Sequence, residues 1–246
     1  MIPKVIHYCW FGGKELPPFA KLCITSWKKI IPDYQIIEWN ESNFDVNSNI
    51  YTREAHAAGK YAFVTDYVRL HVLYNHGGIY MDTDVEVLKS LDCFLIHPAF
   101  SGFEDITAIP TGIMASEKGG KWVKEQLKYY ETRHFLKKDG SYDLTTNVTT
   151  ITNSMVAGGF RLDNTRQDYR GIITMYPKEY FCPKDYRTGK IHLTENTYCI
   201  HHFSGSWYTP YQRFKSFFKP LFCRFHLFTP VKKILSFWEK KWENRK

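Results

Sequence analysis

The sequence lacks paired cysteines, long apolar runs and low-complexity segments. Its six cysteines are scattered and none stands in a CxxC pair, which is typical of reduced thiols in a cytosolic protein. No stretch approaches the ~20 consecutive apolar residues of a membrane-spanning helix. The apolar run at the N-terminus is too short for a signal peptide, so we expect a cytoplasmic protein. Without low-complexity segments, most of the 246 residues should fold, and the length suits one large domain.

The body of the chain also lacks an excess of charge of either sign. The formal net charge is +8, but ten basic residues lie from Gln212 onward, opposed by Glu239 and Glu243. The residues before Gln212 therefore carry 23 charges of each sign. A basic body is the usual mark of nucleic-acid binding. Because that mark is missing, we expect no nucleic-acid partner.

The C-terminal tail combines its cations with many aromatic residues. Phe214, Phe217, Phe218 and Leu221 recur at helical spacing, and aromatic residues opposite Lys and Arg are typical of a helix in a membrane interface. Anionic lipids would contribute about 1 kcal/mol per nearby cation. We therefore predict that residues 212–246 bind the inner face of the cell membrane peripherally. The alternative is that these helices pack their aromatic residues on the body.

Strands and helices alternate along the rest of the chain. We predict strands over residues 5–10, 34–39, 79–81, 85–88, 99–103, 108–115, 172–176 and 197–203, and helices over 17–31, 60–75, 121–134 and 145–157. A strand, a helix and a strand at the start predict an α/β fold with parallel strands. We expect a catalytic domain over residues 1–210 and a basic helical tail over 211–246.

Two aspartates, Asp82 and Asp84, follow the short apolar strand at residues 79–81. Ligands of α/β sheets collect at the carboxyl ends of strands, and side chains two apart in extended backbone point the same way. Two such carboxylates repel each other unless a cation lies between them. Oxygen ligands suit Mg²⁺ or Mn²⁺, which can also bind a diphosphate and neutralise a departing phosphate. The alternative is a turn with two solvated aspartates.

Two further groups suit such a site. Asp66 and Arg69 lie three residues apart on one face of the helix predicted at 60–75, where they can grip sugar hydroxyls and phosphate or form a structural ion pair. His201 and His202 can supply a metal ligand or serve the core. Because side chains alternate along a strand, only one of the two histidines can face the metal.

These segments together resemble a known family. Residues 2–13, 65–70 and 77–85, followed by the late His-His and Ser-Trp pairs, resemble the DXD-containing glycosyltransferases of family 32 in order and spacing. That family includes yeast-type initiating mannosyltransferases and bacterial capsular and surface-polysaccharide transferases, and it is similar in its catalytic core to clostridial glucosylating toxins. The resemblance implies an α/β GT-A (Rossmann-like) nucleotide-sugar-binding fold with a mixed central sheet. It also implies a hexosyltransferase that retains anomeric configuration.

The resemblance also implies roles for individual residues. Trp10 would stack on the donor base, Asp82 would reach the metal through water, and Asp84 would bind it directly. The implied metal set, for Mn²⁺ or Mg²⁺, is Asp82, Asp84 and His202. The implied nucleotide-sugar-binding set is Tyr8, Trp10, Thr65, Asp66, Arg69, Asp82, Thr83 and Gly112. The implied catalytic set is Asp66, Arg69, Asp82, Ser206 and Trp207.

The chain departs from the family pattern at two places. Thr65 stands where serine is usual, and residues 110–113 stand where an asparagine-like contact to the donor sugar is expected. The sequence offers no poised nucleophile for double displacement. The resemblance implies attack on the same face through a short-lived ion pair, so that catalysis consists mostly of positioning and charge stabilisation.

Two other classes of protein share parts of this pattern. Metal-dependent phosphohydrolases with an aspartyl nucleophile also use Asp-x-Asp after a strand, but Glu86 stands where they usually carry Thr or Val. A non-catalytic carbohydrate- or lipid-binding module does not need the paired aspartates and Trp10 together. We therefore predict a transferase that moves a sugar from a UDP- or GDP-sugar to a saccharide or lipid-linked saccharide in glycan biosynthesis.

Overall fold

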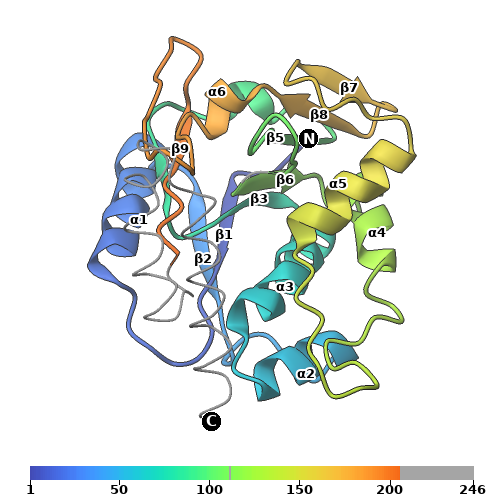
Figure 1. Ribbon diagram of the computed structural model, residues 1–246. Helices are drawn as coiled ribbons and strands as arrows, with labels where there is room; N and C mark the ends of the chain where they lie inside the picture. Colours follow the sequence, from blue (N-terminus) through green and yellow to red (C-terminus); the bar gives the residue numbers. More distant parts are fainter. Residues whose placement is uncertain (111, 206–246) are drawn as a thin grey trace, which may run out of the picture. The chain divides into compact units, whose positions relative to one another are not determined.

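The computed structural model describes residues 1–110 and 112–205 (Figure 1). In this part of the chain a seven-stranded mixed sheet is accompanied by a two-stranded sheet. The large sheet has the spatial order β2 (Gln35–Trp39), β1 (Val5–Cys9), β3 (Gly78–Met81), β6 (Ile113–Ser116), β5 (Ala99–Gly102), β8 (Ile173–Tyr176) and β7 (Gln167–Tyr169). The small sheet pairs β4 (Val85–Val87) with β9 (Cys199–His201). The predicted α/β fold with a mixed central sheet is confirmed.

The large sheet mixes parallel and antiparallel pairs. Strands β2, β1 and β3 run parallel to one another, β6 is antiparallel to both β3 and β5, β5 and β8 are parallel, and β7 is antiparallel to β8. The parallel strands at the N-terminal end agree with the strand, helix, strand pattern of the sequence. Because parallel neighbours need a crossover, α1 and α3 lie between them in the sequence.

Helices connect and cover the strands (Figure 1). They are α1 (Pro18–Ile30), α2 (Ile50–Ala57), α3 (Tyr61–His76), α4 (Lys121–Lys128), α5 (Asn147–Ala157) and α6 (Lys178–Phe181), together with a short 3₁₀ turn at Asp92–Phe94. The predicted helices at 17–31, 60–75 and 145–157 are confirmed within two residues at each end. The helix predicted at 121–134 ends at Lys128, and α2 was missed although Asn49 caps it. No helix in the described part of the chain combines the length and apolarity needed to span a bilayer.

Side chains alternate between the two faces of β3. Ile79 and Met81 pack in an apolar cluster with residues of α1, whereas Tyr80 packs in a second cluster with residues of α3. This alternation has the period of two expected of a strand. Asp82, two residues beyond Tyr80, therefore lies on the side of the sheet that faces α3.

The chain turns between β3 and β4 at the two aspartates. Asp82, Thr83 and Asp84 form a turn closed by a hydrogen bond of 3.0 Å from the Val85 N–H to the Asp82 carbonyl. The sequence analysis expected extended backbone here, and that expectation is wrong. The turn directs the chain out of the large sheet, so that β4 pairs with β9 instead. The aspartates thus lie where the two sheets meet.

His7 lies fully buried in the middle of β1. Its Nδ1 accepts a hydrogen bond of 3.0 Å from Trp39 Nε1, and its Nε2 lies 2.8 Å from the Gly77 carbonyl. Because an indole nitrogen can only donate, the proton of neutral His7 must be on Nε2. Burial lowers the pKa of His7 from 6.5 to about 4, although the Gly77 carbonyl opposes this effect.

We expect His7 to contribute to the acid sensitivity of the fold. Because its folded pKa is depressed, its contribution is fully present above pH 6.5 and is lost as the pH falls through about 4. The loss amounts to about 3 kcal/mol at ~1.4 kcal/mol per pKa unit. Urea unfolding of His7→Gln should therefore show a shallower decline in unfolding free energy between pH 6.5 and 4. His192→Gln, at an exposed position, serves as control, and equal slopes for wild type and His7→Gln would contradict the prediction.

Candidate active site

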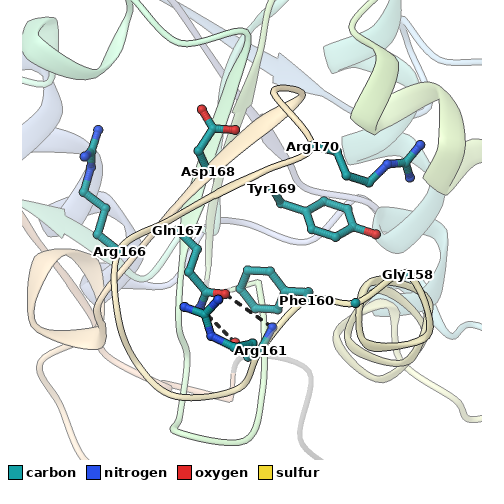
Figure 2. A pocket seen from close by; sticks show the side chains of 9 residues that line it. Gly158, Phe160, Arg161, Arg166, Gln167, Asp168, Tyr169 and Arg170 are labelled. Atoms are coloured by element: carbon teal, nitrogen blue, oxygen red, sulfur yellow. Dashed lines mark hydrogen bonds between the residues drawn. The ribbon is translucent and has the colours of Figure 1, made fainter.

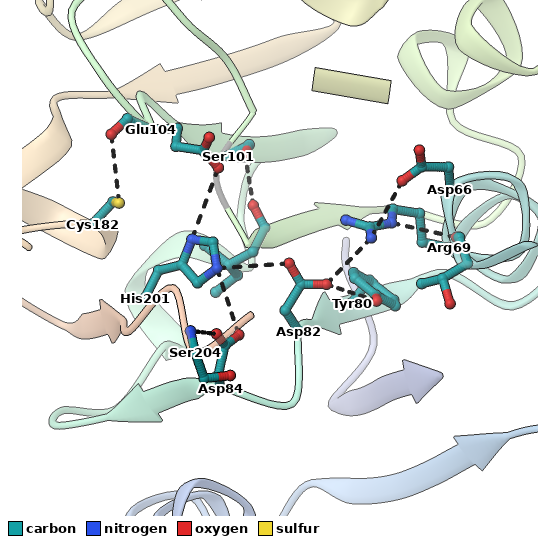
Figure 3. A network of polar contacts seen from close by, with 12 residues as sticks. Asp66, Arg69, Tyr80, Asp82, Asp84, Ser101, Glu104, Cys182, His201 and Ser204 are labelled. Atoms are coloured by element: carbon teal, nitrogen blue, oxygen red, sulfur yellow. Dashed lines mark hydrogen bonds and ion pairs between the residues drawn. The ribbon is translucent and has the colours of Figure 1, made fainter. Parts of the chain in front are cut away.

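Three potential metal ligands come together at the turn between the two sheets. Asp82 and Asp84 belong to the turn, and His201 is the last residue of β9. Each offers one ligand atom, and these atoms all lie within 4.8 Å of one another. His201 Nε2 lies 3.5 Å from Asp84 Oδ1 and 3.8 Å from Asp82 Oδ2 (Figure 3). The described residues therefore form one candidate cation site from two distant segments of the chain.

Each aspartate has one oxygen held by the protein and one directed toward His201. Asp82 Oδ1 accepts a hydrogen bond of 2.9 Å from the Tyr80 hydroxyl and lies 3.3 Å from the Arg69 guanidinium. Asp84 Oδ2 accepts a hydrogen bond of 2.6 Å from the Ser204 backbone N–H. The other two oxygens, Asp82 Oδ2 and Asp84 Oδ1, are the ones that face the imidazole. Both carboxylates are therefore oriented before any ligand binds.

The site favours the charged form of Asp84. Burial opposes ionisation, but the positive charge of His201 and hydrogen bonds from His201 and Ser204 outweigh it, so the pKa of Asp84 lies well below its ordinary value. Burial also opposes the charged form of His201, yet Asp84 and Cys182 hold its pKa well above 6.5. His201 and Asp84 therefore favour each other's charged form.

Arg69 joins this cluster to α3. Its guanidinium lies 3.5 Å from Asp66 Oδ1 and 3.3 Å from Asp82 Oδ1, and it stacks 4.6 Å above the ring centre of Tyr80. Asp66 also accepts a hydrogen bond of 3.1 Å from the Asn147 N–H at the start of α5. Burial raises the pKa of Asp66 to about 6, against the opposing charge of Arg69. Asp66 and Arg69 form the ion pair that the sequence analysis gave as one of two alternatives, and Arg69 also contacts Asp82.

The donor set fits a divalent cation. Two carboxylates and one imidazole suit Mn²⁺ or Mg²⁺, and three protein ligands leave positions for the oxygens of a diphosphate. Asp82 Oδ2, Asp84 Oδ1 and His201 Nε2 are the atoms that would hold the ion. Mutual repulsion of the carboxylates would decrease when the ion binds.

The histidine beside the two aspartates is His201, whereas the metal set implied by the family resemblance contains His202. His201 lies opposite Val85 in the β4–β9 pair, while Glu86 lies opposite Ile200. Alternation therefore places His202 on the face of Glu86, and its Nε2 lies 2.8 Å from Glu86 Oε2. Since Asp84 is in the turn and not in a strand, its side chain can face His201.

Residues 17–101 of the chain match the family model described as a glycosyltransferase sugar-binding region containing the DXD motif. The matched segment is roughly a third of the chain and includes Asp66, Arg69, Asp82 and Asp84. The match therefore covers α3 and the turn that carries both aspartates.

Relatives of known activity align with part of the chain. Inositol phosphoceramide mannosyltransferase 3 of Schizosaccharomyces pombe is 31% identical over 143 residues, which cover 52% of this chain and 36% of that protein. Inositol phosphoceramide mannosyltransferase 2 of the same organism is 30% identical over 120 residues, which cover 47% of this chain and 34% of that protein. The chain thus spans about a third of the length of these curated relatives. Among solved structures, PaToxG Glycosyltransferase aligns at 21% identity with a TM-score of 0.47, covering 64% of this chain and 71% of that one.

Gly112, a predicted donor-binding residue, lies directly against the cation site. A Cβ atom at this position would stand 3.0 Å from the His201 ring and 3.1 Å from Asp82 Oδ2. Its carbonyl also accepts a hydrogen bond of 2.8 Å from the Asp82 N–H. Glycine therefore allows the loop before β6 to approach the two ligands closely, a role that the sequence alone did not show.

The other predicted donor-binding residues have separate contacts. The Tyr8 hydroxyl donates to Glu38 Oε2 at 2.6 Å, and the half-buried Trp10 donates from Nε1 to the Lys14 carbonyl. The Thr65 carbonyl accepts from Arg69 Nε at 3.3 Å. Thr83 is buried in the turn. Their roles toward a donor stay predictions. The predicted catalytic residues Ser206 and Trp207, the tail domain 211–246 and the membrane segment 212–246 lie outside the described residues.

Sequence reasoning missed three residues of this site. Tyr80 holds Asp82, the Ser204 backbone holds Asp84, and Glu104 Oε2 lies 3.8 Å from His201 Nδ1. The position of Tyr80 two residues before Asp82 was a usable signal, because both side chains then share a face. Ser204 acts through its backbone, and Glu104 depends on a tertiary contact, so neither carried a pattern.

A separate cavity of about 430 Å³ lies beside β7 (Figure 2). Residues 158–161 and 166–170 line it. Strand β7 is the outer strand of the large sheet, four positions from β3. Arg170, one of the arginines that line the cavity, forms an ion pair with Glu125 at 3.2 Å. None of the predicted site residues lines this cavity.

We expect Arg69→Met to lower the unfolding free energy by about 3–5 kcal/mol at pH 7.5, because it leaves buried carboxylates without their cation. Since the folded pKa of Asp66 is raised to about 6, the stability linked to Asp66 is present at low pH and is lost as the pH rises through that value. Without Arg69 this pKa rises further. The difference in unfolding free energy between wild type and Arg69→Met should therefore be smaller at pH 5, where Asp66 takes up a proton.

Urea unfolding of wild type, Arg69→Met, Asp66→Asn and the double variant tests this prediction. The two substitutions should be less than additive, since Asp66→Asn removes a charge that Arg69 would have compensated. A deficit of equal size at pH 7.5 and pH 5 would contradict the prediction.

Proposed function

We propose that the chain is a metal-dependent, retaining glycosyltransferase that moves a sugar from a nucleotide-sugar donor to a saccharide or lipid-linked saccharide. The observation that carries this proposal is the convergence of Asp82, Asp84 and His201 within 4.8 Å, next to a buried arginine. The family match over residues 17–101 supports the same conclusion, since it includes both aspartates.

The proposed mechanism assigns a task to each side chain. Asp84, Asp82 and His201 would hold Mn²⁺ or Mg²⁺, and the bound ion would neutralise charge on the departing diphosphate. Arg69 contributes a second positive charge beside Asp82, which favours binding of a phosphate or a sugar hydroxyl. Asp66, which Arg69 holds from the other side, would accept hydrogen bonds from hydroxyl groups of the donor sugar. These residues bind and orient the donor.

Retention follows, in our proposal, from attack on the same face as the departing group. Both oxygens of Asp66 are engaged, by Asn147 N–H and by Arg69, while Asp82 has one oxygen held by Tyr80 and Arg69 and the other directed toward the proposed cation. A covalent glycosyl–enzyme intermediate would require one of these groups to leave its partners. A short-lived ion pair needs only positioning and charge stabilisation.

The relatives suggest the first donor and acceptor to examine. Both are named mannosyltransferases of inositol phosphoceramide, a lipid. We therefore propose a mannosyl donor as the leading candidate among UDP- and GDP-sugars, and a lipid-linked acceptor. The basic aromatic segment 212–246 suits an enzyme bound peripherally to the inner face of the cell membrane. A role in capsular or surface glycan biosynthesis would follow from such an acceptor.

A donor screen tests the function directly. The full chain would be incubated with UDP-, GDP- and CDP-sugars, with and without Mn²⁺, while binding is followed by calorimetry and sugar release by chromatography. We expect one nucleotide class to bind only with metal and to lose its sugar slowly to water. Release of phosphate from simple phosphate esters, without sugar-nucleotide binding, would support a phosphohydrolase and overturn the proposal. Binding of free saccharides alone would support a non-catalytic module.

Asp84→Asn should remove most turnover while leaving the fold intact. The amide keeps the shape of the side chain but loses the charge that attracts the cation, so we expect a decrease of about 100-fold or more in kcat, on the scale of losing one electrostatic contact in a transition state. Glu117→Gln, at a distant carboxylate that pairs with the N-terminus, serves as control. Near-normal transfer by Asp84→Asn in added Mn²⁺ would count against the proposed site.

A further inference from the structure

The two ring nitrogens of His201 face different groups. Nε2 faces the aspartates, whereas Nδ1 is buried and has no hydrogen-bond partner among the described residues. Glu104 Oε2 lies 3.8 Å from Nδ1, on the side of the ring away from the aspartates (Figure 3). A buried nitrogen without a partner thus points toward a carboxylate that the proposed function has not yet used.

Binding of a cation by His201 determines where its proton must be. Nε2 needs a free lone pair, so the single proton of the neutral ring must sit on Nδ1. A buried N–H without an acceptor costs about 1–3 kcal/mol. Metal-binding histidines almost always donate this second N–H to a carboxylate, a carbonyl or a water. His201 therefore needs an acceptor beside Nδ1 to serve as a ligand.

The backbone of Glu104 is fixed from both sides. Its N–H donates to the Ala108 carbonyl at 2.9 Å, and its carbonyl accepts from Lys178 Nζ at 2.7 Å and from Cys182 Sγ at 3.5 Å. Among the described residues, the ion-pair partner of the Glu104 carboxylate is His201. Rotation of the Glu104 side chain needs to shorten the distance from Oε2 to His201 Nδ1 by about 1 Å to form a charge-assisted hydrogen bond. The position of Glu104 is thus set by contacts that do not involve its carboxylate.

We propose that Glu104 is a positioning residue that accepts the Nδ1–H of His201 and so directs Nε2 toward a divalent cation bound with Asp82 and Asp84. This inference rests on the proposed function in that it requires the cation site. Cys182 is the competing group beside the ring, but its thiol already points to the Glu104 carbonyl. A carboxylate oxygen is also a stronger hydrogen-bond acceptor than a thiol sulfur.

Calorimetric titration of the full chain with MnCl₂ tests the proposal. Glu104→Ala should weaken Mn²⁺ binding by about 10–100-fold, the usual effect of removing a partner of a metal-binding histidine. Glu104→Gln, which keeps a neutral acceptor of the same shape, should weaken it less. Glu86→Gln is the matched control, since Glu86 pairs with the neighbouring His202 at 2.8 Å on the other face of β4. That control should bind Mn²⁺ within about twofold of wild type, because it removes no atom of the proposed set.

A second measurement separates positioning from a structural role. In ¹⁵N spectra recorded with saturating Mg²⁺, the His201 ring of wild type should carry its proton on Nδ1 with the shift of a hydrogen-bonded nitrogen. Glu104→Ala should lose that signature at an unchanged thermal midpoint of the metal-free protein. If Glu104→Ala does not fold, the Gln variant carries both measurements.

The outcomes distinguish this inference from the proposed function. Mn²⁺ binding that is lost in Asp84→Asn but unchanged in Glu104→Ala would keep the function and overturn the role of Glu104. A loss in Cys182→Ser as large as that in Glu104→Ala would also overturn it. Absence of Mn²⁺ binding by wild type would overturn the cation site itself.

Discussion

The contact of one buried guanidinium with two carboxylates organises the site. Arg69 lies between Asp66 of its own helix and Asp82 at the end of β3; Arg69 and Asp66 are buried, and Asp82 is half-buried. Without the guanidinium, the two carboxylates would disfavour each other's charged form. The stacking of Arg69 on Tyr80, 4.6 Å from the ring centre, fixes the plane of the guanidinium. The carboxylate of Asp82 therefore has a defined direction.

A change of sheet creates the rest of the arrangement. The chain leaves the large sheet at Asp82 and enters the small one at Val85, opposite His201. This change brings a residue more than 100 positions later in the sequence next to the aspartates. The loop before β6 completes the same corner, because Gly112 has no side chain to separate it from Asp82 and His201. Four segments thus meet around the three ligand atoms: α3, the turn at residues 82–84, β9 and the loop before β6.

The sequence predicted the parts of this site that depend on local patterns. The apolar periodicity of 60–75 located α3, and the apolar run before Asp82 located β3, so Asp66, Arg69 and both aspartates were placed correctly in their elements. The choice between His201 and His202 depends on the register of β4 with β9, which no local pattern encodes. The contact of Glu104 with His201 depends on the same tertiary pairing. Long-range register therefore explains why the sequence did not show that His201 and Glu104 lie beside the aspartates.

The two buried aspartates nearest to Arg69 and His201 have opposite electrostatic surroundings. Burial dominates at Asp66 and raises its pKa to about 6, whereas His201 and Ser204 hold the pKa of Asp84 well below the ordinary value. A carboxylate that stays charged suits the permanent attraction of a cation. A carboxylate near its titration range can both accept and donate hydrogen bonds to sugar hydroxyls. The proposed division of labour, metal binding by Asp84 and sugar binding by Asp66, would therefore follow from burial and neighbouring charge, because the side chains themselves are identical.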